Sequence, residues 1–308
     1  MRVRAESGNG RWWLRMADVL QWISTALERL AGEQLVRRRR VVHPLPDGWC
    51  VVDGRRLRNF ASNDYLGLAG DERLLAAARS AMESAGAGAR SSPLVCGRSE
   101  WHERLETRLA EFEGAEAAIL FPTGYAANAG TIAALVGRGD VVIGDRLNHA
   151  SLIDGCRMSR ADVRIYPHRD VAALESELDQ HAGARRKLIV TDGVFSMDGD
   201  LAPLRDLVEV PSDILRCCWS TKPTAPASGG RADAACEELH VENRVHPDRH
   251  AQQGGGHKGF AVGSRSLVDW LWHSARPQVF STAAQRPAVR RHWRRSRSSN
   301  GSRTGGPD

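Results

Sequence analysis

A turn of three residues, Thr123-Gly124-Tyr125, carries chemistry that can be read directly from the sequence. It lies where an apolar stretch passes into a helical pattern, and backbone amides at a helix N-terminus favour a phosphate group. Gly124 lets the backbone approach such a ligand closely. A plain left-handed turn is the alternative interpretation, but the order of motifs along the chain favours a phosphate site.

Polar side chains follow two further apolar stretches. His149 comes after the stretch that ends near Asp145, and Ser196 comes after Lys187–Val190. In α/β proteins ligands bind at the carboxyl ends of the strands, so we expect His149 at such an edge. The alternatives are a helix-capping or core histidine, and a serine that caps a helix or closes a turn.

Helical and strand patterns alternate from Glu72 onward, and these elements must position the candidate residues. Such alternation predicts an α/β fold with a mostly parallel sheet covered on both faces. Upstream, Met16–Leu30 has the spacing of an amphipathic helix, and Trp49–Phe60 is typical of a hairpin that turns at Asp53-Gly54. Over Pro211–Ala234 no clear period remains. Strands are expected at 117–121, 140–144, 163–166, 187–190 and 260–264, and helices at 72–84, 101–113, 125–136, 150–159, 171–178, 203–208 and 267–272.

The bulk composition is ordinary for a soluble globular protein. The chain has 308 residues, of which 42% are hydrophobic and 26% charged. No run is long and apolar enough to span a bilayer, and residues 1–15 lack the apolar segment of a secretory signal, so we expect a cytoplasmic protein. The net charge of +6 arises in residues 284–308, where seven arginines face one acid, and a disordered tail explains it better than nucleic-acid binding. Six cysteines without a CxxC pair predict neither a disulfide framework nor a metal site.

Three longer runs enclose the candidate residues. They are Phe121-Pro-Thr-Gly-Tyr-Ala-Ala-Asn128, Asp145-Arg-Leu-Asn-His-Ala-Ser151 and Thr191-Asp-Gly-Val-Phe-Ser-Met-Asp-Gly-Asp200. Together they closely resemble the α-oxoamine synthases, which are pyridoxal phosphate (PLP) enzymes. The resemblance runs continuously over about Met16–Val210 and implies a PLP fold-type I large domain, like that of aspartate aminotransferase, in a homodimer.

The resemblance also implies a reaction. It is the decarboxylative condensation of an amino acid with an acyl thioester, here L-alanine with pimeloyl-CoA or a pimeloyl carrier protein. Other members of the family use glycine or serine with a different acyl-CoA and share these motifs, so the substrates stay open. Small molecules are the implied partners, with no nucleic acid and no membrane.

Individual residues inherit roles from the resemblance. Gly124 and Tyr125 match the pair that contacts the cofactor. His149 matches the histidine that stacks on the PLP ring, with ring stacking or acid–base work as its role, and Ser196 matches the hydroxyl that meets the phenolic oxygen. Arg37 lies where the family places an arginine that meets the acyl substrate, but within four consecutive arginines a solvated charge run is about as consistent.

Two motifs that the resemblance requires are missing. The family carries Val-Asp-Glu-Ala-His where this chain has Cys217–Pro223, and a Ser-Lys run with the Schiff-base lysine in the region of His246–Gly255. The chain has three lysines, Lys187, Lys222 and Lys258, and none of them stands in that motif. Without this lysine and the aspartate, PLP loses its covalent attachment and the partner of its pyridine nitrogen. We therefore expect the chain as written to be impaired, and a non-catalytic protein that binds a partner or the cofactor is the alternative.

The genetic code accounts for both gaps. Permissible codons for Arg216–Ser228 can be read one frame away as MLLVDEAHGTGV, and those for His246–Gly256 can be read in another frame as IRIGTLSKAVG, with the lysine codon across Gln253 and Gly254. Codons for Val289–Gly305 permit AAALAAQSIVEREPDR. We hypothesise small insertions or deletions near residues 211, 234, 245, 256 and 283.

This hypothesis divides the chain into four segments. Residues 1–15 would be an upstream extension that is not native, and 16–60 an arm of one helix and a hairpin. Residues 61–283 would be the PLP-binding large domain, out of frame over 211–234 and 246–256. Residues 284–308 would be a disordered, out-of-frame basic tail, which leaves the C-terminal small domain largely missing.

Resequencing the gene across the codons for residues 205–308 and beyond tests the hypothesis. We expect single-base corrections that restore VDEAH, LSKA and a longer C-terminus, because the shifted frames already contain those segments. If an independent sample returns the bases as translated, the lysine is truly absent and the synthase resemblance describes ancestry only.

Overall fold

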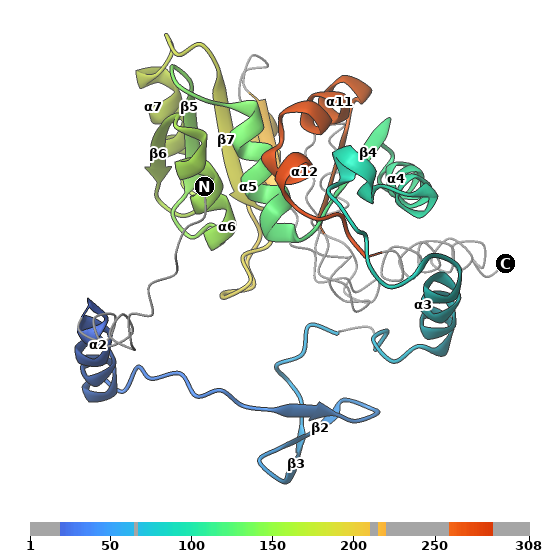
Figure 1. Cartoon of the computed structure of the whole chain (residues 1–308). Helices are drawn as coiled ribbons and strands as arrows, with labels where there is room; N and C mark the ends of the chain where they lie inside the picture. Colours follow the sequence, from blue (N-terminus) through green and yellow to red (C-terminus); the bar gives the residue numbers. More distant parts are fainter. Residues whose placement is uncertain (1–18, 65–66, 210–214, 220–258, 286–308) are drawn as a thin grey trace, which may run out of the picture. The chain divides into compact units, whose positions relative to one another are not determined.

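The computed structural model describes residues 19–64, 67–209, 215–219 and 259–285 (Figure 1). The chain divides into two compact units, Met1–Phe60 and Ala61–Asp308, and each is described by itself. Within the described ranges, every helix is too short or too polar to cross a membrane.

The first unit contains a helix and a small antiparallel sheet. Helix α2 covers Gln21–Gly32 and buries none of its residues. Strands β1 (Val42–Pro44), β2 (Trp49–Val52) and β3 (Arg55–Arg58) pair in that order. The predicted hairpin is present, and its turn residues Asp53 and Gly54 have φ of 50° and 75°, the left-handed conformation that a tight hairpin of this kind needs. Strand β1 was not predicted, because three residues are too few for a period.

The second unit alternates helices and strands as predicted. Among the described elements, a π-helical turn (η1), a strand (β8) and a short helix (α12) were not expected from the sequence. In chain order the elements are α3 (Glu72–Ala85), η1 (Pro93–Gly97), α4 (Glu100–Glu113), β4 (Ala117–Phe121), α5 (Gly124–Leu135), β5 (Val141–Asp145), α6 (Ala150–Ser159), β6 (Asp162–Tyr166), α7 (Val171–Gln180), β7 (Lys187–Asp192), α8 (Leu204–Glu209), β8 (Leu215–Trp219), β9 (Gly259–Gly263), α11 (Arg265–Ser274) and α12 (Arg276–Phe280).

The larger sheet of this unit is wholly parallel. Its strands run in the order β6-β5-β7-β8, while β4 and β9 form an antiparallel pair. Residues 211–234 show no clear period in the sequence, yet Leu215–Trp219 form strand β8. These five residues pair with β7 in the register Val190↔Cys217, so the backbone ladder orders a segment whose side chains have no clear period.

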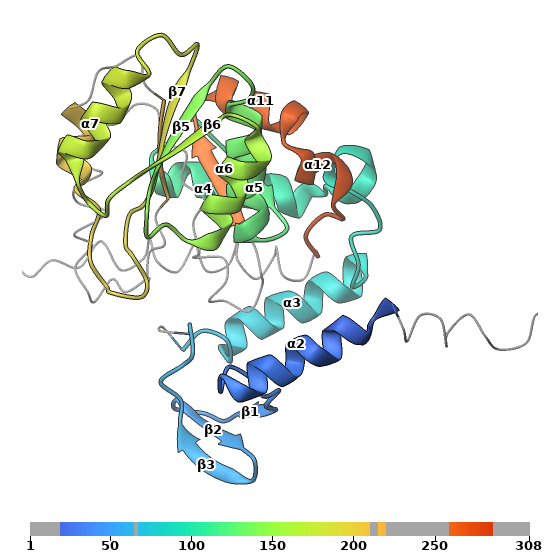
Figure 2. The same ribbon diagram turned by 90° about the vertical axis from the view of Figure 1, so that its left-hand side faces the viewer.

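Side chains of the parallel strands alternate between two cores, which confirms the predicted α/β fold with both faces of the sheet covered. Helices α5 and α6 cover one face, and α7 and α8 cover the other, while α11 packs against α5 and the β4–β9 pair (Figures 1 and 2). Gly155 permits close contact of α5 and α6, because a Cβ there would lie 3.0 Å from the Ala129 Cα. Strand residues facing α5 and α6 include Val142, Leu188 and Val190, and those facing α7 and α8 include Val141, Ile143 and Ile189.

A buried carboxylate ties the amino ends of β5 and β7 together. Asp140 is fully buried and accepts hydrogen bonds from Arg185 Nε (2.9 Å), Arg186 Nη2 (2.9 Å) and the Gly137 amide (2.8 Å). Burial alone would raise the pKa of Asp140, but these donors outweigh it and hold the pKa at about 2. The candidate site lies at the opposite edge of the sheet, at the carboxyl ends of these strands.

Asp140→Asn should lower the free energy of unfolding at pH 7 by about 2 kcal/mol, because charge-assisted hydrogen bonds are lost. The folded-state pKa lies below the ordinary value, so the stabilisation is complete above about pH 4 and is lost as the pH falls through about 2. Urea unfolding at several pH values measures both effects. Asp162→Asn, at an exposed ion pair with Arg164, is the control and should change stability by less than about 0.5 kcal/mol. Equal losses for the two variants would contradict the structural role of Asp140.

Candidate active site

The predicted phosphate turn opens helix α5. Thr123 is the N-cap, and its Oγ1 accepts a hydrogen bond from the Ala126 amide at 3.0 Å. The amides of Gly124 and Tyr125, first in the helix, have no intrahelical acceptor, so they suit an anion. The Tyr125 hydroxyl donates to Asp154 Oδ2 at 2.7 Å, which joins α5 to α6 and raises the pKa of the phenol.

Strand β9 supports this turn from behind. The first residue of β9, Gly259, pairs with Phe121 at the end of β4. A Cβ at Gly259 would lie 2.7 Å from the Gly124 Cα and 2.8 Å from the Thr123 carbonyl oxygen. Only a glycine allows this approach, so the position of the turn depends on the close contact with β9.

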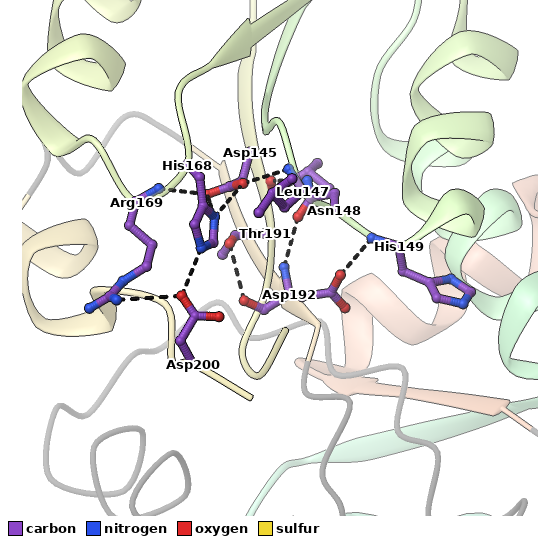
Figure 3. Close-up of polar contacts among 10 residues, drawn as sticks. Asp145, Leu147, Asn148, His149, His168, Arg169, Thr191, Asp192 and Asp200 are labelled. Carbon is purple, nitrogen blue, oxygen red and sulfur yellow. Dashed lines mark hydrogen bonds and ion pairs between the residues drawn. The ribbon is translucent and has the colours of Figure 1, made fainter. Parts of the chain in front are cut away.

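The loop after β5 holds His149 in place through its backbone (Figure 3). The His149 amide donates to Asp192 Oδ2 at 2.6 Å, at the carboxyl end of β7. Asp192 is buried, and its own amide donates to Asn148 Oδ1 at 3.0 Å. These hydrogen bonds join the loop after β5 to the end of β7. His149 therefore lies at the carboxyl edge that the sequence predicts.

The imidazole of His149 caps helix α6. Its Nδ1 accepts a hydrogen bond from the Ser151 amide at 3.2 Å and lies 2.7 Å from Ser151 Oγ. Asn128 Nδ2 donates to the same hydroxyl at 2.7 Å, which leaves the hydroxyl proton for Nδ1. These donors assign the ring proton to Nε2. The capping alternative for His149 is thus present in the structure.

Ser196 and Arg37 lie in different parts of the chain. Ser196 is exposed in the loop that follows β7, where Val194 and Leu201 form an isolated antiparallel bridge. Arg37 is exposed in the first unit, after α2. The structure brings Gly124, Tyr125 and His149 to neighbouring helix starts, because α5 and α6 pack against each other.

A second polar cluster at this edge was not singled out from the sequence. His168, after β6, contacts Asp145 at the end of β5 and Asp200 in the loop after β7 (Figure 3). Asn148 and Asp192 were likewise not assigned roles. The signal that could have found them is position, since each follows or ends a parallel strand at the carboxyl edge.

The described residues fit one end of a PLP molecule and not the other. The turn at Gly124 and Tyr125 suits the phosphate, and His149 offers a ring at the same edge. Lys187 is buried at the first residue of β7, about 17 Å along the strand from Asp192, so it cannot reach this edge. Lys222 and Lys258 lie outside the described residues.

Comparison with known proteins identifies the family. The model of the aminotransferase class I and II family matches residues 55–214. An 8-amino-7-oxononanoate synthase from Azoarcus sp. (strain BH72) is 46% identical over 275 residues, covering 87% of this chain and 70% of that protein. The chain belongs to the α-oxoamine synthase family. A second 8-amino-7-oxononanoate synthase, from Geobacter metallireducens, is 43% identical over 266 residues, which cover 85% of this chain and 68% of that protein.

Solved structures agree with this assignment. A serine palmitoyltransferase from S. paucimobilis with PLP and myriocin bound matches with a TM-score of 0.82 and 26% identity, covering 92% of this chain and 72% of that chain. The α-oxoamine synthase family is PLP-dependent, and the parallel-sheet unit is the fold-type I large domain. By family, the chain is a PLP-dependent acyltransferase of the 8-amino-7-oxononanoate synthase type.

Gly259→Ala should push β9 away from the phosphate turn. We expect a loss of about 1–3 kcal/mol in the free energy of unfolding, since the added Cβ meets backbone atoms that cannot yield, together with weaker binding of PLP. Urea unfolding and equilibrium dialysis against PLP measure the two effects. Gly137→Ala is the matched control, because its Cβ would meet only the Ser159 carbonyl oxygen at an ordinary 3.7 Å. Unchanged binding in a destabilised Gly259→Ala protein would show that the turn does not depend on β9.

Proposed function

We propose that this protein is built for the condensation of L-alanine with pimeloyl-CoA, or with a pimeloyl carrier protein, to form 8-amino-7-oxononanoate in biotin synthesis. The observation that carries the proposal is the 46% identity to an 8-amino-7-oxononanoate synthase, over 87% of this chain. In the reaction, the alanine α-carbon bonds to the acyl carbonyl carbon, the C–S bond breaks to release the thiol, and the alanine carboxylate leaves as CO₂.

Residues of this chain would share the work as follows. PLP, when bound, supplies the electron sink that stabilises negative charge at the alanine α-carbon. The amides of Gly124 and Tyr125 would hold its phosphate, and the ring of His149 would lie against its ring. Ser196 would donate to its phenolic oxygen. Arg37, from the first unit, would meet the acyl chain of the thioester substrate.

The wider setting is proposed on the same family grounds. We infer a homodimer in the cytoplasm, with small-molecule substrates only. The four segments 1–15, 16–60, 61–283 and 284–308 keep the roles that the sequence predicts, as upstream extension, arm, PLP-binding large domain and out-of-frame tail.

Two described elements support the frame hypothesis for the missing residues. Strand β8 ends at Trp219, and the shifted reading places its aspartate codon across Ser220 and Thr221, directly after the strand. Strand β9 begins at Gly259, against the phosphate turn, shortly after the shifted lysine codon at Gln253 and Gly254. Both restored residues would follow or precede elements that already border the site, as a cofactor partner and a Schiff-base lysine require.

A non-catalytic function is the second candidate, and the position of Lys187 favours it. This lysine stands at the far end of β7 from His149, so the described residues offer no amine to the cofactor edge. A chain translated as written could still bind PLP or another phosphate compound at the turn before α5, without covalent attachment and without turnover.

Comparison of the chain as written with a frame-restored protein tests the proposal. We expect the restored protein to release CoA from pimeloyl-CoA faster with L-alanine than with glycine or L-serine, and borohydride to fix PLP to its restored lysine. In the chain as written, we expect PLP to dialyse away after borohydride treatment, because the lysine is missing. Thiol release and protein mass are the measurements.

Each other outcome points elsewhere. Faster release with glycine or serine would place the protein among the other members of the family. Borohydride labelling of Lys222 or Lys258 in the chain as written would show that an in-frame lysine substitutes, which would contradict the expected impairment. Absence of any PLP binding by a cooperatively folding chain would favour the non-catalytic function.

A further inference from the structure

His168 is bonded to carboxylates of two different elements (Figure 3). Its Nδ1 lies 2.9 Å from Asp145 Oδ1, and its Nε2 lies 2.7 Å from Asp200 Oδ2. Ionised carboxylates accept hydrogen bonds and do not donate them, so both ring nitrogens must carry a proton for both contacts to form. A neutral imidazole has one such proton. The geometry therefore selects the imidazolium form of His168.

The electrostatics agree with this geometry. Burial alone would lower the pKa of His168, but the hydrogen bonds with Asp145 and Asp200 outweigh it and raise the pKa. The hydrogen bond with His168 is also the main cause that lowers the pKa of Asp200. Among the described residues, the charged groups facing this cluster are Asp145, Asp200 and Arg169, whose Nη1 is 3.4 Å from Asp200 Oδ2.

One side of the cluster is rigid. The Asp145 side chain is 1% exposed and also accepts hydrogen bonds from the amides of Leu147 (2.8 Å) and Arg169 (2.9 Å). Those bonds fix it to the ends of β5 and β6. His168 is therefore fixed to the sheet through Nδ1, and its Nε2 holds Asp200 close to the sheet.

The other side of the cluster is the loop of residues 193–201, here called the Ser196 loop. Its backbone folds on itself, with the Phe195 amide donating to the Asp200 carbonyl oxygen at 2.9 Å and the Gly199 amide donating to the Phe195 carbonyl oxygen at 2.7 Å. Phe195 is buried and its ring stands edge-on to His168, with 4.4 Å between ring centroids. Ser196 follows directly and is exposed.

We propose that His168 is a positioning residue, whose imidazolium clamps the Ser196 loop to the sheet and thereby holds Ser196 at the cofactor edge, and that this clamp opens when His168 loses its proton. The role of Ser196 rests on the proposed function. The clamp itself rests only on the contacts of Asp145, His168, Phe195 and Asp200.

The sign of the pH dependence follows from the two pKa directions. His168 has a raised pKa in the folded chain, so its stabilisation is complete below about pH 6.5 and is lost as the pH rises through the raised value. Asp200 has a lowered pKa, so its stabilisation is present above about pH 4 and is lost as the pH falls through the lowered value. The clamp is strongest between about pH 4 and 6.5 and weakens in mild alkali.

Amide hydrogen exchange in the full chain without cofactor tests the clamp. The amides of Phe195, Gly199 and Ala202 report on the Ser196 loop, because each donates to a carbonyl oxygen of that loop. After correction for the intrinsic effect of pH, we expect their protection to fall at least about fivefold between about pH 6 and 9, as one hydrogen bond is lost. His168→Gln should show the low protection at every pH.

A matched histidine variant serves as the control, and a second variant tests the same contact. His181 has the same 18% side-chain exposure as His168 and also lies near two acidic side chains. One of these, Asp162, is the first residue of β6, so His181 lies at the amino edge of the parallel sheet, opposite the edge that carries the Ser196 loop. His181→Gln should leave the loop protection and its pH profile unchanged. If His168→Gln does not fold, Asp200→Asn weakens the same contact by removing the carboxylate charge, at a side chain that is 26% exposed. Loop protection that is independent of pH in the unaltered chain, and unaffected by His168→Gln or Asp200→Asn, would overturn the clamp.

A PLP titration separates this inference from the proposed function. If Ser196 meets the cofactor, His168→Gln and Ser196→Ala should each weaken PLP binding by about fivefold at pH 7, and His181→Gln should not. A loop that opens without any change in PLP affinity would overturn the link from His168 to Ser196. If no protein in the series binds PLP while the loop still responds to pH, the proposed function fails and the clamp stands.

Discussion

The carboxamide of Asn148 is the contact on which the candidate site depends. The ladder between β5 and β7 ends at the pair Gly144↔Val190, and past that point Asn148 takes over from the backbone. Its Nδ2 donates to the Val190 carbonyl oxygen at 2.8 Å and its Oδ1 accepts from the Asp192 amide at 3.0 Å. Gly144 leaves room for this side chain, since a Cβ there would lie 3.3 Å from Nδ2. A buried side chain thus satisfies backbone groups that would each cost about 1–3 kcal/mol if left unpaired.

Because the Asn148 side chain takes the place of backbone pairing here, the loop after β5 and the Ser196 loop are attached to the same part of the sheet. The loop that carries Asn148 begins at Asp145, which is bonded to His168 and, through it, to the Ser196 loop. The same loop ends at His149, whose amide is bonded to Asp192. His149 and the Ser196 loop are therefore both attached to the short segment Asp145–His149 at the end of β5, although 47 positions separate His149 from Ser196 in the sequence. A shift of that loop would move both together.

The sequence predicts the elements well where a core imposes a period. Val141, Val142 and Ile143 alternate between two cores, and the strand they form is the one predicted, within one residue. Strand β8 escaped prediction because its order comes from pairing with β7, and pairing leaves no mark on the side-chain pattern of Leu215–Trp219. The His168 contacts escaped for a related reason, since its partners lie 23 and 32 residues away.

The candidate-site residues differ in the same way, because some features depend on local sequence and others on distant contacts. The helix start at Gly124 could be predicted because the change from a strand pattern to a helical pattern is a local property of the sequence. That this helix start binds phosphate stays a prediction. The capping role of His149 could be offered only as an alternative, since it depends on Ser151 and, through it, on Asn128 in another helix. Local chemistry can be read along the chain, whereas the orientation of a ring requires the packed structure.

The sequence shows the family of the chain more clearly than its catalytic activity, because the fold depends on many residues and the activity on few. The described part of the fold rests on three clusters of buried residues whose apolar members are spread over many positions, most of them before residue 211. Covalent attachment of PLP rests on one lysine, and protonation of its pyridine nitrogen on one carboxylate. A short change of reading frame can remove both while sparing nearly every core contact. A chain can therefore keep the architecture of an α-oxoamine synthase, including the phosphate turn and the edge that carries His149, without the two side chains that make the cofactor react.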